Sequence, residues 1–121
     1  MYLLGVLLVH LVNNMPLIKL ENDDAKVPDK DIEELSKAVR DIVSETTGIA
    51  DVFVYANSAK IKVQIAPIEI FVEISAPKIK DADALIGEIK KKLSSWKAAN
   101  SFGYPINLTL IPMNWKVEID I

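Results

Sequence analysis

The stretch from Met15 to Gly48, MPLIKLENDDAKVPDKDIEELSKAVRDIVSETTG, decides the fold because it joins a strand pattern to a helix pattern through one polar loop. Pro16 to Leu20 alternates apolar and polar residues, which is typical of a half-buried strand. From Asp29 onward the apolar residues recur at helical spacing, and they form one stripe: Ile32, Leu35, Val39, Ile42 and Val43. The stretch therefore predicts a strand followed by an amphipathic helix.

Both ends of this helix carry recognisable signals. Pro28 and Asp29 open it, and Asp29 is the predicted N-cap. At the other end, Gly48 suits the left-handed position after a helix, and Ile49 suits the hydrophobic contact that accompanies it.

Two further strand patterns follow the first helix. DVFVYA, residues 51–56, is rich in β-branched and aromatic residues, and KIKVQI, residues 60–65, alternates strictly. The short NSA turn between them predicts a hairpin. Pro67 interrupts the ladder because proline has no N–H to donate.

The second half repeats this design with a period of about 50 residues. IEIFVEIS, residues 68–75, predicts a strand, and Asp81 is the predicted cap of a second helix. The buried stripe of that helix is Leu85, Ile86, Ile89, Leu93 and Trp96. INLTLI, residues 106–111, predicts a strand, a turn is expected at 112–114, and WKVEIDI, residues 115–121, predicts a terminal strand.

The predicted fold class is α+β. Repeats at about 15–65 and 67–121 each form a β-α-β unit with a right-handed crossover and parallel pairing. Two helices on one face of a four-stranded core sheet give a two-layer sandwich. Short extra strands are expected at the edges, where they could pair with other chains.

Composition excludes several classes of site. The 121 residues correspond to about one domain. There is no cysteine and only one histidine, His10, which excludes disulfides, thiolate metal sites and histidine clusters. The net charge of −3 does not favour nucleic acid. We therefore expect no metal, no cofactor and no nucleic-acid partner. The single glutamine, beside many Ile, Lys and Glu residues, is a weak sign of a thermophile.

Residues 1–14 form an apolar N-terminal extension that differs from the rest of the chain. Its core, YLLGVLLVHLV, is shorter than the roughly 20 residues needed to span a bilayer. It also lacks the positively charged start of a signal peptide. We expect no membrane association and a cytoplasmic location.

From Met15 to Ile121 the chain resembles the tautomerase superfamily. The likeness rests on the Met15-Pro16 opening, on the helix of residues 33–49, and on two later strand stretches, IEIFVEISAP and INLTLIPMNW. The layout is similar to the macrophage migration inhibitory factor group, to the 5-carboxymethyl-2-hydroxymuconate isomerases and to small uncharacterised prokaryotic relatives.

The resemblance implies a homotrimer in which edge strands pair between subunits. It also implies an N-terminal proline in a pocket at the subunit interface, acting as general base for the enol–keto isomerisation of a small keto acid. An α-amine has a pKa of about 7.7–8.0 in a model peptide, and burial lowers that pKa toward neutrality. Such an amine suits proton transfer at neutral pH.

This chemistry requires Pro16 to be the mature N-terminus, because an amide nitrogen is not a base. Two readings of residues 1–14 remain open. In the first, they reflect a misassigned start, and removal of Met15 exposes Pro16. In the second, the extension is real and must bury its apolar surface.

The expected site consists of Pro16 as the catalytic residue and of Lys19, Lys26, Asn107 and Thr109 as substrate-binding residues. Members of the superfamily place cations near the proline, whereas the single arginine here, Arg40, is predicted on the solvent face of the first helix. Asn107 and Thr109 stand about where inhibitory-factor-like members have Tyr and Asn. A member that has lost its activity is a further reading.

Two alternatives come from other classes. The same order of elements fits a ferredoxin-like sandwich that binds a small ligand or a protein without catalysis. A structural oligomer that exchanges its N-terminal segments between subunits is the third hypothesis.

Overall fold

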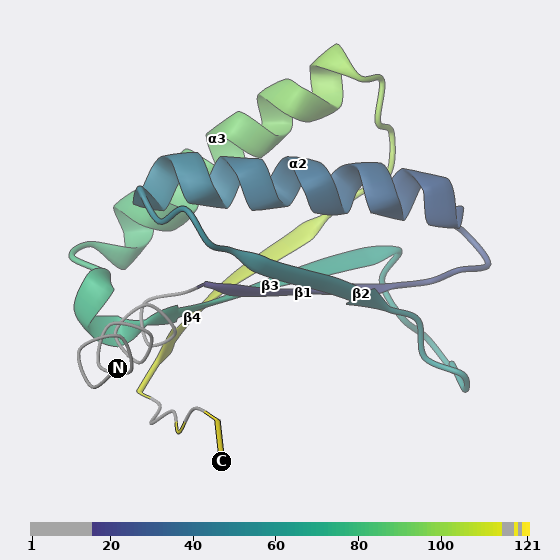
Figure 1. Ribbon diagram of the computed structural model, residues 1–121. Coiled ribbons are helices and arrows are strands. Elements are labelled where there is room, and N and C mark those ends of the chain that lie inside the picture. The colour runs from purple at the N-terminus through teal and green to yellow at the C-terminus, as the bar shows by residue number, and fades with distance from the viewer. Residues whose placement is uncertain (1–15, 115–117, 119) are drawn as a thin grey trace.

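A computed structural model describes residues 16–114, 118, 120 and 121 of the chain. Figure 1 shows two helices lying across one face of a sheet, while none of the described helices lies on the other face. The elements in chain order are β1 (Leu17–Asn22), α2 (Asp29–Thr47), β2 (Phe53–Asn57), β3 (Ile68–Ser75), the 3-10 turn η1 (Ala76–Lys78), α3 (Ala82–Ala99) and β4 (Asn107–Met113). The predicted α+β class and two-layer sandwich are confirmed.

The sheet has the strand order β2-β1-β3-β4. β1 pairs with β2 in parallel, β3 pairs with β4 in parallel, and β1 meets β3 antiparallel at the centre. A ferredoxin-like sandwich is built from split β-α-β units, in which another strand separates the two strands of each unit. Here the two strands of each unit are direct neighbours, so the ferredoxin-like alternative is wrong as a description of the fold.

The core lies between the sheet and the helices. Alternation along the two central strands turns one set of side chains toward the helices, and each of these is at most 1% exposed: Ile18, Leu20, Ile68, Ile70, Val72 and Ile74. The predicted stripe of α2 is buried against them along its whole length. α3 buries only Ile89 and Leu93 of its predicted stripe, and the other three members are partly exposed.

The predicted helix ends hold with one exception. Gly48 has φ 73° and donates its N–H to the Ser44 carbonyl, as a left-handed terminus requires. Asp81 accepts the N–H of Ala84 at 3.0 Å and caps α3. The N-cap of α2 is Pro28 rather than Asp29, because Pro28 keeps an extended backbone while Asp29 is already helical.

Two predicted elements are wrong. Residues 60–65 form no strand, because their backbone groups have no partner strand in the described part of the chain. The turn expected at 112–114 is absent, since β4 runs on through Pro112 and Met113, which lie opposite Ile74 and Ser75. An edge strand tolerates proline when its missing N–H faces away from the ladder. The apolar extension and most of the predicted terminal strand, 115–121, lie outside the described residues.

Candidate functional site

Pro16 is fully buried at the start of β1. Its carbonyl accepts the N–H of Phe53 at 3.0 Å, which fixes it against the start of β2. Leu17 lies opposite Glu73 of β3, so one further step along the register places Pro16 opposite Ile74. Alternation along β1 turns Pro16 toward the same, helix-covered side of the sheet as Ile18.

A cleft of about 450 Å³ opens at this end of the sheet, and Ile74 is part of its wall. The C-terminal end of α2, the η1 turn and the first turn of α3 supply its other walls. The lining residues are Thr46, Thr47, Gly48, Ile49, Ile74, Lys78, Ile79, Lys80, Asp81, Ala84 and Leu85. Because register places Pro16 beside Ile74, this is the cleft that we consider as a substrate site.

The cleft is positively charged. Lys78 and Lys80 line it, and the one carboxylate among its lining residues, Asp81, is engaged in capping α3. Both lysines are exposed, and within residues 16–114 neither forms an ion pair. Cations with no carboxylate to neutralise them can bind a carboxylate of a small ligand.

Sequence patterns did not identify these two lysines, because the stretch from Ala76 to Asp81 has neither strand nor helix periodicity. One signal was available. Pro77 follows a central strand and lies in the tight turn Ala76–Lys78, which the hydrogen bond from Ile79 N–H to the Ala76 carbonyl, 3.0 Å, closes. Loops that follow the strands of a sheet commonly carry binding residues.

Lys19 lies on the sheet face away from the helices. Its Nζ is 2.8 Å from Oε2 of Glu73, a residue that is only 8% exposed. The hydrogen bond and the charge of Glu73 raise the pKa of Lys19 above its ordinary value. Lys19 is thus neutralised within its own chain and lies on the face opposite to Pro16.

The other three predicted binding residues lie away from Pro16 in the same chain. Lys26 follows the far end of β1 and donates its N–H to the Asp23 carbonyl. Asn107 and Thr109 on β4 are five and three residues from the position opposite Ile74, which is roughly 16 Å and 10 Å at about 3.3 Å per residue. Within one chain the structure brings none of them beside Pro16.

A second proline occupies the equivalent place in the second repeat. Pro67 directly precedes β3, as Pro16 directly precedes β1. Since β1 and β3 are antiparallel, the two prolines lie at opposite ends of the sheet. A hollow of about 300 Å³ near Pro67 is lined by Glu21 and Glu69 and by no lysine, so its charge is negative. Across residues 16–114, no three carboxylate, imidazole or thiol groups gather closely enough to hold a metal ion.

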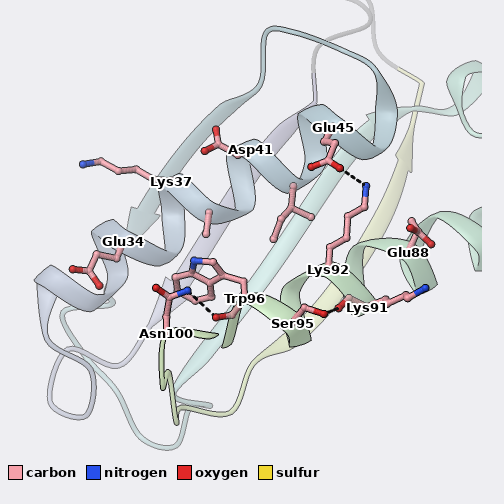
Figure 2. A pocket seen from close by; sticks show the side chains of 12 residues that line it. Glu34, Lys37, Asp41, Glu45, Glu88, Lys91, Lys92, Ser95, Trp96 and Asn100 are labelled. Atoms are coloured by element: carbon pink, nitrogen blue, oxygen red, sulfur yellow. Dashed lines mark hydrogen bonds and ion pairs between the residues drawn. The ribbon is translucent and has the colours of Figure 1, made fainter. Parts of the chain in front are cut away.

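A larger groove, about 790 Å³, runs between α2 and α3 on the outer side of the helices. Figure 2 shows Trp96 at its floor and Lys92 reaching across to Glu45, an ion pair of 3.3 Å. Its rim mixes acidic and basic side chains, and none of the predicted site residues lines it. The groove is separated from Pro16 by the helices themselves, so we do not assign the chemistry to it.

No protein-family model matches the chain, and no curated protein matches it either. Solved structures do match. Leishmania major MIF2 shares 17% identity over 84% of this chain and 94% of its own, with a TM-score of 0.56. The chain has the fold of the tautomerase superfamily.

Two more structures show the same likeness in fold. A fused 4-OT asymmetric trimer is 12% identical over 85% of this chain and 91% of its own, with a TM-score of 0.60. A 5-carboxymethyl-2-hydroxymuconate isomerase from Deinococcus radiodurans is 16% identical over 87% of this chain and 90% of its own, with a TM-score of 0.57. The resemblance inferred from Met15-Pro16 and the repeats is confirmed for the tautomerase fold. No described helix combines the length and hydropathy needed to cross a membrane.

Proposed function

We propose that the chain is a tautomerase that interconverts the enol and keto forms of a small 2-keto acid, with Pro16 as the general base once its nitrogen is a free amine. The observation that carries this proposal is the burial of Pro16 at the end of the sheet where Lys78 and Lys80 line a cleft. The tautomerase fold supports it.

Each part of the site has a chemical task. Burial disfavours the charged ammonium, which lowers the pKa of a terminal proline amine toward neutral pH. The amine takes a proton from the carbon next to the carbonyl, negative charge develops on the carbonyl oxygen, and return of the proton to that oxygen gives the enol. The reverse sequence gives the keto acid. Lys78 and Lys80 hold the carboxylate, and a cation near the oxygen stabilises the developing charge.

Four further residues remain proposed substrate-binding residues: Lys19, Lys26, Asn107 and Thr109. They could bind a substrate beside Pro16 only if they belong to a neighbouring subunit. We accordingly propose a homotrimer. The trimeric state of the fused 4-OT structure supports it, as does the free outer edge of each edge strand in the described part of the chain. The cytoplasmic and thermophilic assignments stay predictions from composition.

The test depends on whether Pro16 is the first residue of the mature chain, with a free amine. The full chain and a chain that begins at Met15 would be produced untagged, and the intact mass of each would be measured. The ultraviolet absorbance of an enol-form 2-keto acid then reports its ketonisation. We expect activity only where the mass shows Pro16 as the first residue, and we expect Pro16→Ala in that chain to lose about 10²- to 10⁴-fold of that activity. Equal activity of Pro16→Ala and its parent would contradict the proposal.

A second function follows if Pro16 stays within the chain, because its nitrogen is then an amide. The cleft with Lys78 and Lys80 does not depend on that nitrogen. The full chain would then bind 2-keto acids without converting them. Titration with pyruvate, followed by the amide NMR signals of residues 78–80, tests this: shifts at that turn with no turnover support a binding protein, and no shifts contradict it.

A further inference from the structure

A groove of about 440 Å³ lies between α3 and the start of the edge strand β4, and we name it the α3–β4 groove. Its apolar walls are Ile86, Leu93, Ile106 and Leu108. Leu93 is 5% exposed, whereas the other three side chains are only half-buried. Sites for small organic ligands are concave and mostly apolar, with volumes of about 300–1,000 Å³. The α3–β4 groove has the size and the lining of such a site.

Gly87 leaves the helix wall of this groove open. A glycine inside a helix destabilises it relative to alanine. The backbone of α3 does not require a glycine there, because Gly87 does not have a positive φ. Packing does not require it either, since a Cβ at Gly87 would meet no atom within 4 Å. The missing side chain serves only the space of the groove, which allows a ligand to lie against the helix backbone.

The charged side chains that line the α3–β4 groove are both lysines, Lys90 and Lys97. Among the described residues neither of them forms an ion pair. Lys97 is half-buried, and its Nζ donates to the Tyr104 carbonyl at 2.7 Å, which fixes the position of the ammonium. An ammonium has three N–H donors, so two remain for a ligand. A fixed cation above an apolar floor favours an anion with an apolar body.

The polar groups at the rim agree with this preference. Ser94 supplies a hydroxyl group, which can donate to an anion. The amide of Asn107 donates to Oε1 of Glu69 at 3.3 Å, and Glu69 itself lies on β3 and is not part of the lining. No carboxylate of the described residues lines the groove.

The other hollows beside α3 differ from this one. The groove toward α2, shown in Figure 2, mixes carboxylates with lysines, and its Lys92 is paired with Glu45. The cleft at Pro16 shares no lining residue with the α3–β4 groove. The α3–β4 groove is therefore a separate place for an anion.

We propose that the α3–β4 groove binds a small carboxylate with an alkyl chain, a ligand of fatty-acid type. Lys97 and Ser94 hold the carboxylate, and Lys90 adds attraction from the exposed rim. The alkyl chain lies along Ile86 and Ile106 and against the backbone at Gly87. An alkyl chain fits better than a ring, because no aromatic side chain lines the groove to stack on one. This binding site does not depend on the chemistry at Pro16.

Titration of the full chain with octanoate, followed by the backbone amide NMR signals, tests the inference. We expect shifts at residues 86–97 and 106–108. Octan-1-ol, which has the chain without the charge, should bind about tenfold more weakly, the effect of losing a hydrogen bond to a charged group. Equal affinity for the alcohol would overturn the assignment of a carboxylate. Shifts confined to residues 78–80 would place the anion in the Pro16 cleft and overturn the inference, as would the absence of shifts.

Lys97→Gln should raise the dissociation constant of octanoate by about tenfold. Lys91→Gln removes the same charge from the side of α3 that lines the groove toward α2, so it is the matched control and should bind like the parent. Lys90→Gln, on the exposed rim, provides a second variant if Lys97→Gln does not fold, and it should raise the constant by about threefold. Equal losses in the groove variants and in Lys91→Gln would overturn the contact with Lys97 and Lys90.

Gly87→Ala tests the placement of the alkyl chain. The added methyl group should raise the dissociation constant of octanoate by about fivefold or more, because it occupies the space in which the chain lies. The same variant should unfold at a higher temperature than the parent, so weaker binding cannot come from loss of the fold. An unchanged dissociation constant would overturn the placement of the chain against the helix.

Discussion

The two ends of the sheet carry the same backbone arrangement and opposite charge. At each end a proline directly precedes a central strand, Pro16 before β1 and Pro67 before β3. The cleft at the Pro16 end is lined by two lysines without ion-pair partners among the described residues. The hollow at the Pro67 end is lined by Glu21 and Glu69, and the nearby Lys62 is held by two aspartates.

The difference shows that the position of a proline in the repeat is not enough to make a site. A general base at a buried proline, as we propose for Pro16, needs cations beside it that can hold an anionic substrate, and of the two described hollows only the one at the Pro16 end is lined by lysines. At the Pro67 end, carboxylates would repel the same substrate, and the lysine is used for structure.

The largest expected effect is the difference in kcat between alanine variants of the two prolines at the two ends of the sheet. In the chain whose mature first residue is Pro16, Pro16→Ala should lower kcat for ketonisation by about 10²- to 10⁴-fold, the range for a general base. Pro67→Ala, at the equivalent place in the second repeat, should change kcat less than about threefold because its nitrogen is an amide in either case. Steady-state kinetics with matched thermal unfolding curves measures both. Similar losses from the two variants would mean that Pro16 acts only as a structural residue.

The lysines of the Pro16 cleft should control binding rather than turnover. Lys78→Gln and Lys80→Gln should each raise KM for a 2-keto acid by about tenfold, because a hydrogen bond to a charged group contributes roughly 1.5–3 kcal/mol and exposure reduces that value. Lys30→Gln, an exposed lysine on the first turn of α2, is the control and should leave KM unchanged. A KM that rises equally in all three variants would point to general electrostatics instead of a specific contact.

Replacing two glycines by alanine, Gly48 after α2 and Gly87 inside α3, should change the free energy of unfolding in opposite directions. Gly48 lines the Pro16 cleft at φ 73°, where a Cβ is strained although no atom lies within 4 Å of it. Gly48→Ala should lower the free energy of unfolding by about 1 kcal/mol. Gly87, inside α3 and equally free of neighbours, should give a gain of about 0.5–1 kcal/mol as alanine. Urea unfolding of both variants decides this, and a stable Gly48→Ala would mean that the helix end can rearrange.

The smallest expected effect is on pH dependence: the ion pairs of Lys62 with Asp23 and Asp24, near Pro67, should make stability change at the extremes of pH. The pKa of Asp24 is lowered in the fold, so its contribution to stability is present above the ordinary value of 3.8 and is lost as pH falls through the lower, folded value. The pKa of Lys62 is raised, so its contribution is full below 10.5 and is lost as pH rises through the higher, folded value. Unfolding of the parent and of Lys62→Met should therefore differ at pH 7 and converge at both extremes. A constant difference across that range would contradict the assignment.

Much of the fold was predictable because local pattern and tertiary packing agree. The stripe of α2, the left-handed Gly48 and the cap at Asp81 were all predicted from spacing and residue type, and the structure confirms them. Residues 60–65 were predicted wrongly for a physical reason. Alternation shows that a segment can form a strand, but a strand also needs a neighbour, and periodicity does not reveal where that neighbour lies.

Of the proposed site, sequence patterns singled out Pro16 alone, and its catalytic role stays a prediction. Pro16 could be identified because it opens the first repeat. Lys78 and Lys80 were not singled out: the proline turn after a strand was their one local signal, and their closeness to Pro16 arises only because β3 lies antiparallel to β1. Lys19 was chosen by its nearness in sequence, and alternation along β1 places it on the other face, where Glu73 binds it.

In the strand order β2-β1-β3-β4, each repeat contributes one central strand and one edge strand. A half-turn about an axis between β1 and β3 therefore exchanges the two repeats. A twofold dimer of half-length chains, one β-α-β unit from each chain, would have the same arrangement. Fusion makes the pairing of the halves intramolecular, which raises their effective concentration. It also places one proline after a peptide bond permanently, because a chain has a single amino terminus. At most one of the two prolines can therefore carry a free amine in a chain that joins both repeats, and the second proline position is free to take on another task.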